Sequence, residues 1–197
     1  MKISPPPVLG GIIGLWPGMA TAHDAFGDLG PFYQGLLHPL ADPAQGILLA
    51  AMAILLARQP VIAARIGVVL AGPVALVAVL IMNATGIASP GLRLTGLAIA
   101  LIGVLAVVGL WMPLVLTQTC VIVAAVLAGA MTDPTEGMRG TLLLAAGTGA
   151  GAALTMLFLW AVTDQVHALW GRIPSAVAGS WFSAIGIMTA ALPEITG

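Results

Sequence analysis

Six apolar segments, separated by short breaks that contain glycine, proline or charged residues, dominate this chain. Hydrophobic residues make up 60% of it and charged residues only 7%, whereas a soluble domain carries about 25% charged residues. A helix that spans a bilayer needs about 20 mostly apolar residues. The sequence therefore predicts an all-α, polytopic bundle of transmembrane helices. The six expected spans are 43–57, 61–82, 92–111, 113–131, 141–162 and 175–192.

Two of the breaks constrain the helices beside them. The first span is short, and a start near Phe32 with a break at His38-Pro39 would lengthen it. A residue that precedes proline is biased away from helical geometry, which favours a break at that point. The break at Met112-Pro113 is so short that the spans on either side of it are expected to form an antiparallel hairpin.

The first 22 residues have the features of a secretory signal peptide. Lys2 provides a short positive region, Val8–Met19 a mostly apolar stretch, and Ala20-Thr21-Ala22 the small-x-small cleavage pattern. Cleavage after Ala22 would leave a single transmembrane domain, 23–197, with six spans. An uncleaved segment would instead give a seventh span.

A cleaved signal places the mature N-terminus outside the cell membrane. Arg58, Arg65 and Arg172 then fall on the cytoplasmic side, and Arg93 and Arg139 fall outside, which is a weak positive-inside excess. We therefore expect a multi-pass protein of the bacterial inner membrane, with both mature termini in the periplasm.

Several classes of function find little support in the sequence. The formal net charge is −1, and a nucleic-acid partner would require a basic surface. Cys120 is the only cysteine, which excludes an intrachain disulfide and argues against a thiolate metal cluster. The chain has no Gly-x-Ser-x-Gly motif, nucleotide-binding loop or His-Glu-x-x-His motif. We expect a protein that is not an enzyme and that holds no permanently bound cofactor.

Residues 23–42 are the polar exception in this apolar chain. They contain His23 and His38, two of the three histidines, and three of the seven acidic residues. Imidazole and carboxylate are ligands that divalent first-row metals favour. We predict that His23, Asp24 and His38 capture a divalent metal ion. The alternatives are a disordered N-terminus and a His38 that only hydrogen-bonds a carbonyl group at the helix break.

One five-residue pattern occurs twice. Asp42-Pro43-Ala44-Gln45-Gly46 is echoed by Asp133-Pro134-Thr135-Glu136-Gly137, in each case before an expected span. Asp as N-cap, Pro at the first helical position and Gln or Glu at the third form a capping box, so both copies predict helix starts. The functional alternative is a pair of acidic helix mouths on one face, with Asp42, Asp133 and Glu136 lining a metal vestibule. A helix N-terminus stabilises such carboxylates but opposes a cation beside them.

Small residues are dense in the fifth expected span, above all in the run Gly-Thr-Gly-Ala-Gly-Ala-Ala at 147–153. Small faces let helices approach closely in a bilayer, where lipid gives no hydrophobic drive between them. Tight packing is the simpler interpretation. The alternative is a thin-walled conduit lined by backbone and Thr148.

Residues 26–40, Phe-Gly-Asp-Leu-Gly-Pro-Phe-Tyr-Gln-Gly-Leu-Leu-His-Pro-Leu, resemble the start of the HupE/UreJ family, and 179–185 is similar to that family's last helix. Its members are small membrane proteins found with hydrogenase or urease genes and regarded as nickel, sometimes cobalt, permeases. The resemblance implies secondary transport of a divalent metal for metalloenzyme maturation. The better-known branch carries an Asp-His pair where this chain has Ala44-Gln45, so two of the family's ligands are replaced here.

The leading functional hypothesis is a permease in the lipid bilayer for Ni²⁺ or Co²⁺, with the metal as the transported ion. A second hypothesis is a non-transporting structural or assembly subunit, which packs through its small-residue faces as a homo-oligomer or against a larger membrane complex. A third is a channel for a small neutral solute, which would fit spans that are rich in glycine and poor in charge.

Overall fold

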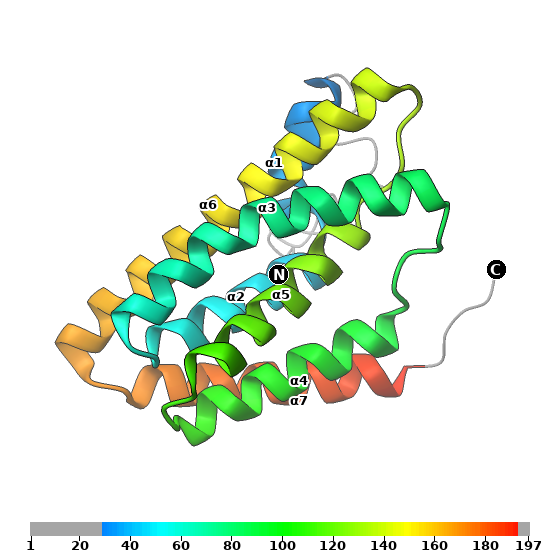
Figure 1. Ribbon diagram of the computed structural model, residues 1–197. Helices are drawn as coiled ribbons and strands as arrows, with labels where there is room; N and C mark the ends of the chain where they lie inside the picture. Colours follow the sequence, from blue (N-terminus) through cyan, green and yellow to red (C-terminus); the bar gives the residue numbers. More distant parts are fainter. Residues whose placement is uncertain (1–28, 193–197) are drawn as a thin grey trace, which may run out of the picture.

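The computed structural model describes residues 29–192, and the regular elements in that part of the chain are all helices (Figure 1). The predicted all-α class is confirmed. The predicted signal peptide, 1–22, and the candidate ligands His23 and Asp24 lie outside the described residues. The helices are α1 (Gly30–Ala41), α2 (Pro43–Ala57), α3 (Val61–Thr85), α4 (Leu92–Val108), α5 (Leu114–Ala130), α6 (Met138–Trp170) and α7 (Ile173–Ala191).

Three of these helices, α3, α6 and α7, are long and apolar enough to cross a membrane. Helices α1 and α2 pass the same test together, but they are bent by 72°, as in a broken span or a re-entrant loop. Helices α4 and α5 are apolar but have 17 residues each, about 26 Å at 1.5 Å per residue. The described part of the chain therefore has three long candidate spans, or four when the bent pair counts as one. The predicted six crossings would further require α4 and α5 to span the bilayer.

The predicted break at His38-Pro39 is wrong. Both residues lie inside α1, and the chain bends instead at Asp42. Helix α1 packs along α6, where Gly35 lies against the backbone and hydroxyl of Thr148. We attribute the helical geometry of His38 to this packing, because tertiary contacts override local preferences such as the bias before proline.

Helix α6 is longer than the sequence predicts. The expected span ends at residue 162, but the helix continues to Trp170 and is followed by Gly171, whose φ of +69° suits glycine. Its 33 residues measure about 50 Å, which exceeds the roughly 30 Å of a hydrocarbon core. The segment expected as a loop after residue 162 is therefore mostly the last turns of α6.

The glycines of α6 bring two other helices into backbone contact. A Cβ at Gly147 would collide with the Phe32 carbonyl group of α1, and one at Gly149 would lie 2.7 Å from the Gly72 carbonyl oxygen of α3. Thr148, which lies between these glycines in the sequence, is completely buried. Small residues permit such close approaches in membranes. The prediction of tight packing for this run is confirmed.

Helices α4 and α7 form a second close pair and lie side by side in Figure 1. Gly96 of α4 meets Gly186 of α7, and Gly103 meets Gly179, so the two helices run antiparallel. Helix α4 contacts α5 only weakly, so the two helices that flank Met112-Pro113 are not packed against each other along their length.

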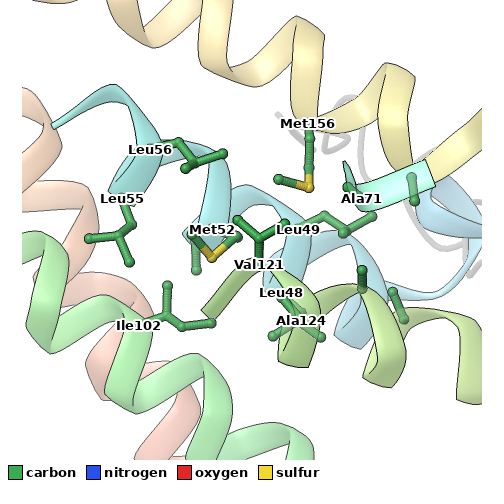
Figure 2. Packing of buried hydrophobic residues seen from close by; sticks show 14 of the residues in the cluster. Leu48, Leu49, Met52, Leu55, Leu56, Ala71, Ile102, Val121, Ala124 and Met156 are labelled. Atoms are coloured by element: carbon green, nitrogen blue, oxygen red, sulfur yellow. The ribbon is translucent and has the colours of Figure 1, made fainter. Parts of the chain in front are cut away.

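Helix α2 is the centre of the bundle and contacts each of the other six helices of the described chain. A helix that is apolar all round is expected to be buried on all sides. Its large side chains fill the space between the outer helices (Figure 2). The completely buried ones are Leu48, Leu49, Met52, Leu55 and Leu56.

The loops gather at two ends of the bundle. At the first, which we call the Asp42 end, the α3–α4 and α5–α6 loops border adjoining cavities with the α1–α2 bend. At the second, the Arg58 end, hydrogen bonds join the end of α2 to the α4–α5 and α6–α7 loops. The membrane side that each of these ends faces stays a prediction.

Candidate functional site

A cavity of about 390 Å³ lies at the Asp42 end, beside the bend between α1 and α2. The end of α1 and the start of α2 supply part of its lining, and the loop between α5 and α6 supplies much of the rest. Three predicted site residues, from segments far apart in the sequence, are brought together here. The polar lining residues are Gln34, His38, Asp42, Thr132, Asp133 and Thr135.

Asp42 begins α2 as the sequence predicts. Its carboxylate accepts hydrogen bonds from the backbone N–H groups of Ala44 at 2.8 Å and Gln45 at 3.4 Å, and Pro43 occupies the first helical turn. An N-cap of this kind satisfies backbone donors that the helix leaves unpaired. The Gln45 side chain does not complete the capping box, because it is bonded elsewhere.

The sharp bend depends on close backbone contacts. The N–H of Asp42 donates to the His38 carbonyl oxygen at 2.8 Å, which closes the last turn of α1. A Cβ at Gly46 would lie 2.5 Å from the Pro39 carbonyl oxygen, so only glycine lets the start of α2 come this near to α1. His38 and Asp42 are therefore held on the two sides of a fixed corner.

His38 is half-buried and is joined to a buried glutamine. Its Nδ1 lies 3.0 Å from Oε1 of Gln45, whose Nε2 donates to the Ala128 carbonyl oxygen of α5 at 2.6 Å. Gln45 is completely buried. The alternative in which His38 only hydrogen-bonds a carbonyl group at the helix break stays open, because the partner of Nδ1 is the amide carbonyl oxygen of Gln45, just beyond the bend at Asp42. The one signal for Gln45 in the sequence is an amide within an otherwise apolar helix.

Asp133 also lines the cavity, from the loop before α6. The predicted helix start at Asp133 is wrong, because α6 begins at Met138 after Gly137, whose φ is +77°. The Thr141 hydroxyl donates to the Gly137 carbonyl oxygen at 3.1 Å and accepts from Asn83 Nδ2 at 2.7 Å. These bonds tie the start of α6 to α3, and the N-cap position itself is Gly137, which offers no side-chain cap. Asp133 is thus a loop carboxylate and not a helix mouth.

A second cavity of about 260 Å³ adjoins the first and lies beneath the α3–α4 loop. The two cavities share Thr132, Asp133 and Pro134 in their linings. The hydroxyl of Thr132 is buried and has no hydrogen-bond partner among the described residues. Residues 132–134 therefore line both cavities, which lie at the same end of the bundle.

The structure brings together His38, Asp42 and Asp133 of the six predicted site residues. Glu136 lines neither of the two cavities, so its predicted place in the vestibule is not supported. Within residues 29–192, no group of three or more His, Cys, Asp or Glu side chains is close enough to hold a metal ion. The cavity as described offers one imidazole and two carboxylates at its walls, which suit a cation more than an anion.

Comparison with known proteins adds no assignment: no family model, no curated protein and no solved structure matches this chain.

Proposed function

We propose that this protein is a permease of the bacterial inner membrane that carries a divalent transition metal, nickel or cobalt first, for metalloenzyme maturation. The observation that supports it best is a polar cavity at the break of a discontinuous helix. Discontinuous helices form the substrate sites of many secondary transporters. Here the break sets His38 and Asp42 beside the cavity, and a distant loop adds Asp133.

The chemistry of these groups supports a metal cargo. An ionisable side chain in an apolar, membrane-embedded chain is costly and is by default a candidate for function. The N-terminus of α2 at Asp42 is positive and opposes a cation, so carboxylates at the cavity would have to offset that field. We propose that His23 and Asp24, from the segment before residue 29, join His38 in capturing the ion.

The proposal includes the membership in the HupE/UreJ family that residues 26–40 suggest, and a bundle of six crossings. The Asp42 end would face the periplasm and the Arg58 end the cytoplasm. The membrane potential would then favour inward movement of the metal by about 2.3 kcal/mol per charge per 100 mV.

A second candidate, a non-transporting assembly subunit, is favoured by one observation. Between the two ends, the centre of the bundle is filled by apolar side chains that are completely buried (Figure 2). Leu48, Met52 and Leu55 follow one another along α2 and belong to one cluster of buried hydrophobic residues. Transport would require this core to rearrange, whereas an assembly subunit would keep it.

The test of the proposed function is cellular uptake of radioactive nickel at matched expression. The strains compared would carry the wild-type protein, no protein, His38→Ala, and His167→Ala as the matched control, since His167 lies in the last turn of α6 and lines neither cavity. We expect uptake that depends on the protein and on His38 but not on His167.

Uptake that is unchanged by deletion of the protein would contradict the permease. A stoichiometric partner that co-purifies from the same cells would then select the assembly subunit.

A further inference from the structure

Gln45 links the candidate site to the centre of the bundle. It is completely buried in the first turn of α2 and does not line the cavity, so it is not placed to touch an ion there. We infer that Gln45 is a positioning residue, which fixes the His38 ring in the tautomer with its proton on Nδ1 and leaves the Nε2 lone pair for the cargo. The cargo in this statement rests on the proposed function; the tautomer does not.

The orientation of the Gln45 amide follows from its partner on α5. A backbone carbonyl oxygen can only accept hydrogen bonds, so the amide must turn its NH₂ group toward Ala128, where the distance is 2.6 Å. A flipped amide would set two acceptors against each other in a fully buried position, which is costly. The carbonyl oxygen Oε1 of Gln45 is therefore the atom that faces His38.

The tautomer of His38 follows from the same chain of bonds. Oε1 of Gln45 can only accept, so Nδ1 of His38, 3.0 Å away, must carry the hydrogen. In a neutral imidazole the other nitrogen then holds the lone pair. Of the two ring nitrogens, Nε2 is therefore the one that can bind a metal in the cavity.

The arrangement has the form of a support for a metal ligand. A ligating histidine usually donates its second N–H to an acceptor, which fixes the ring and raises the basicity of the bound nitrogen. Gln45 supplies that acceptor from across the 72° bend, seven residues further along the chain. The ring orientation is thereby tied, through Gln45, to the backbone of α5.

The tautomer can be read directly by ¹⁵N NMR of histidine-labelled, full-length protein in lipid nanodiscs. His38→Ala assigns the His38 signals among the three histidines of the chain. At a pH where the ring is neutral, we expect a protonated Nδ1 and a bare Nε2 in the wild type. We expect Gln45→Leu to lose the protonated Nδ1 signal.

The matched control is Gln118→Leu. Gln118 also donates from its amide to a backbone carbonyl, that of Ala63 at 2.9 Å, but it lies on a different helix contact and not beside His38. This variant is expected to keep the wild-type His38 signals. A wild-type His38 protonated on Nε2 would overturn the inference, whether or not the variants fold, and so would an unchanged Nδ1 signal in folded Gln45→Leu.

Nickel separates this inference from the proposed function. Added Ni²⁺ is expected to broaden the Nε2 signal of His38, and Gln45→Leu should weaken nickel binding by about tenfold or more, as loss of a supporting residue commonly does. If Nδ1 of His38 is protonated but added nickel changes none of its signals, the metal cargo is overturned and the tautomer is supported. A weakened nickel response in Gln45→Leu without a change of tautomer would overturn the positioning role of Gln45 while supporting the cargo.

Discussion

The two ends of the bundle use their polar residues differently. At the Arg58 end, side chains are consumed in bonds that join loops: Arg58 donates to the Arg172 carbonyl oxygen at 3.0 Å and to the Ser175 hydroxyl at 2.8 Å. At the Asp42 end, the polar side chains border a cavity of about 390 Å³, and His38 there is also hydrogen-bonded to Gln45. We call the Arg58 end the seal, because its side chains join loops, and the Asp42 end the vestibule, because its side chains border a cavity.

The seal is notable because its central residue is a buried cation. Arg58 is only 8% exposed, and burial together with the nearby charge of Arg172 lowers its pKa. The C-terminal ends of α2 and α4 offset part of this cost, since Arg58 caps the first and lies against Gly109 of the second. The N-terminus of α7, where Arg172 and Ser175 accept its hydrogen bonds, opposes the cation. Helix C-termini carry partial negative charge and favour cations.

The largest expected effect comes from breaking the seal. Arg58→Ala should lower the stability of the protein by about 2–4 kcal/mol, because it removes charged hydrogen bonds and leaves buried acceptors. The measurement is thermal unfolding in detergent. Arg65→Ala, which removes an exposed arginine from the next helix, is the matched control. Equal unfolding temperatures for the two variants would show that the Arg58 end is not a seal.

A smaller effect is expected from the neighbouring glutamine. Gln59 donates to the Leu110 carbonyl oxygen at 3.2 Å and accepts from the Met112 N–H at 2.9 Å. Gln59→Leu should cost about 1–3 kcal/mol, because two backbone groups lose their partner in a buried place. The same unfolding assay measures this loss of stability. A Gln59→Leu variant as stable as the wild type would show that Gln59 does not contribute to the seal.

At the vestibule, two variants of Asp42 separate the effect of its charge on nickel binding from its effect on stability as a helix cap. Asp42→Ala should cost about 1 kcal/mol through loss of the N-cap, while Asp42→Asn should keep most of that stability because asparagine caps as well as aspartate. Both variants should bind nickel more weakly, since both lose the carboxylate. Full nickel binding by a folded Asp42→Asn protein would assign Asp42 to helix capping alone.

The smallest effect is expected at Glu136. This residue lines neither cavity, although its sequence pattern matches that of Asp42. Glu136→Gln should leave nickel uptake and thermal stability unchanged, within about 0.5 kcal/mol for the latter. Uptake that falls as far as in His38→Ala would extend the vestibule beyond the cavity described.

Predictions from sequence succeeded where the cause is local. Asp42 begins a helix because its carboxylate reaches backbone N–H groups two and three residues ahead, and any Asp-Pro start can do so. The same pattern failed at Asp133, where α6 begins only after Gly137 and its first turns are bonded to Asn83, 58 residues before Thr141. Local chemistry cannot reveal a partner at that separation.

The sequence predicted which ionisable residues line the candidate site, but not the hydrogen bonds that hold them in place. His38, Asp42 and Asp133 were chosen for their chemistry, and the fold brings them to one cavity. The role of Gln45 was missed because its partner, Ala128, lies 83 residues away and contributes only a backbone carbonyl, which no sequence pattern marks.

The measurement that tests the central claim most directly is equilibrium binding of radioactive nickel to the purified full-length protein, with His38→Ala and His167→Ala in parallel. If the vestibule captures the metal, the wild type and His167→Ala will bind nickel alike, and His38→Ala will lose most of that binding. Equal binding by all three proteins would contradict the account, because the metal would then be held elsewhere or not specifically at all.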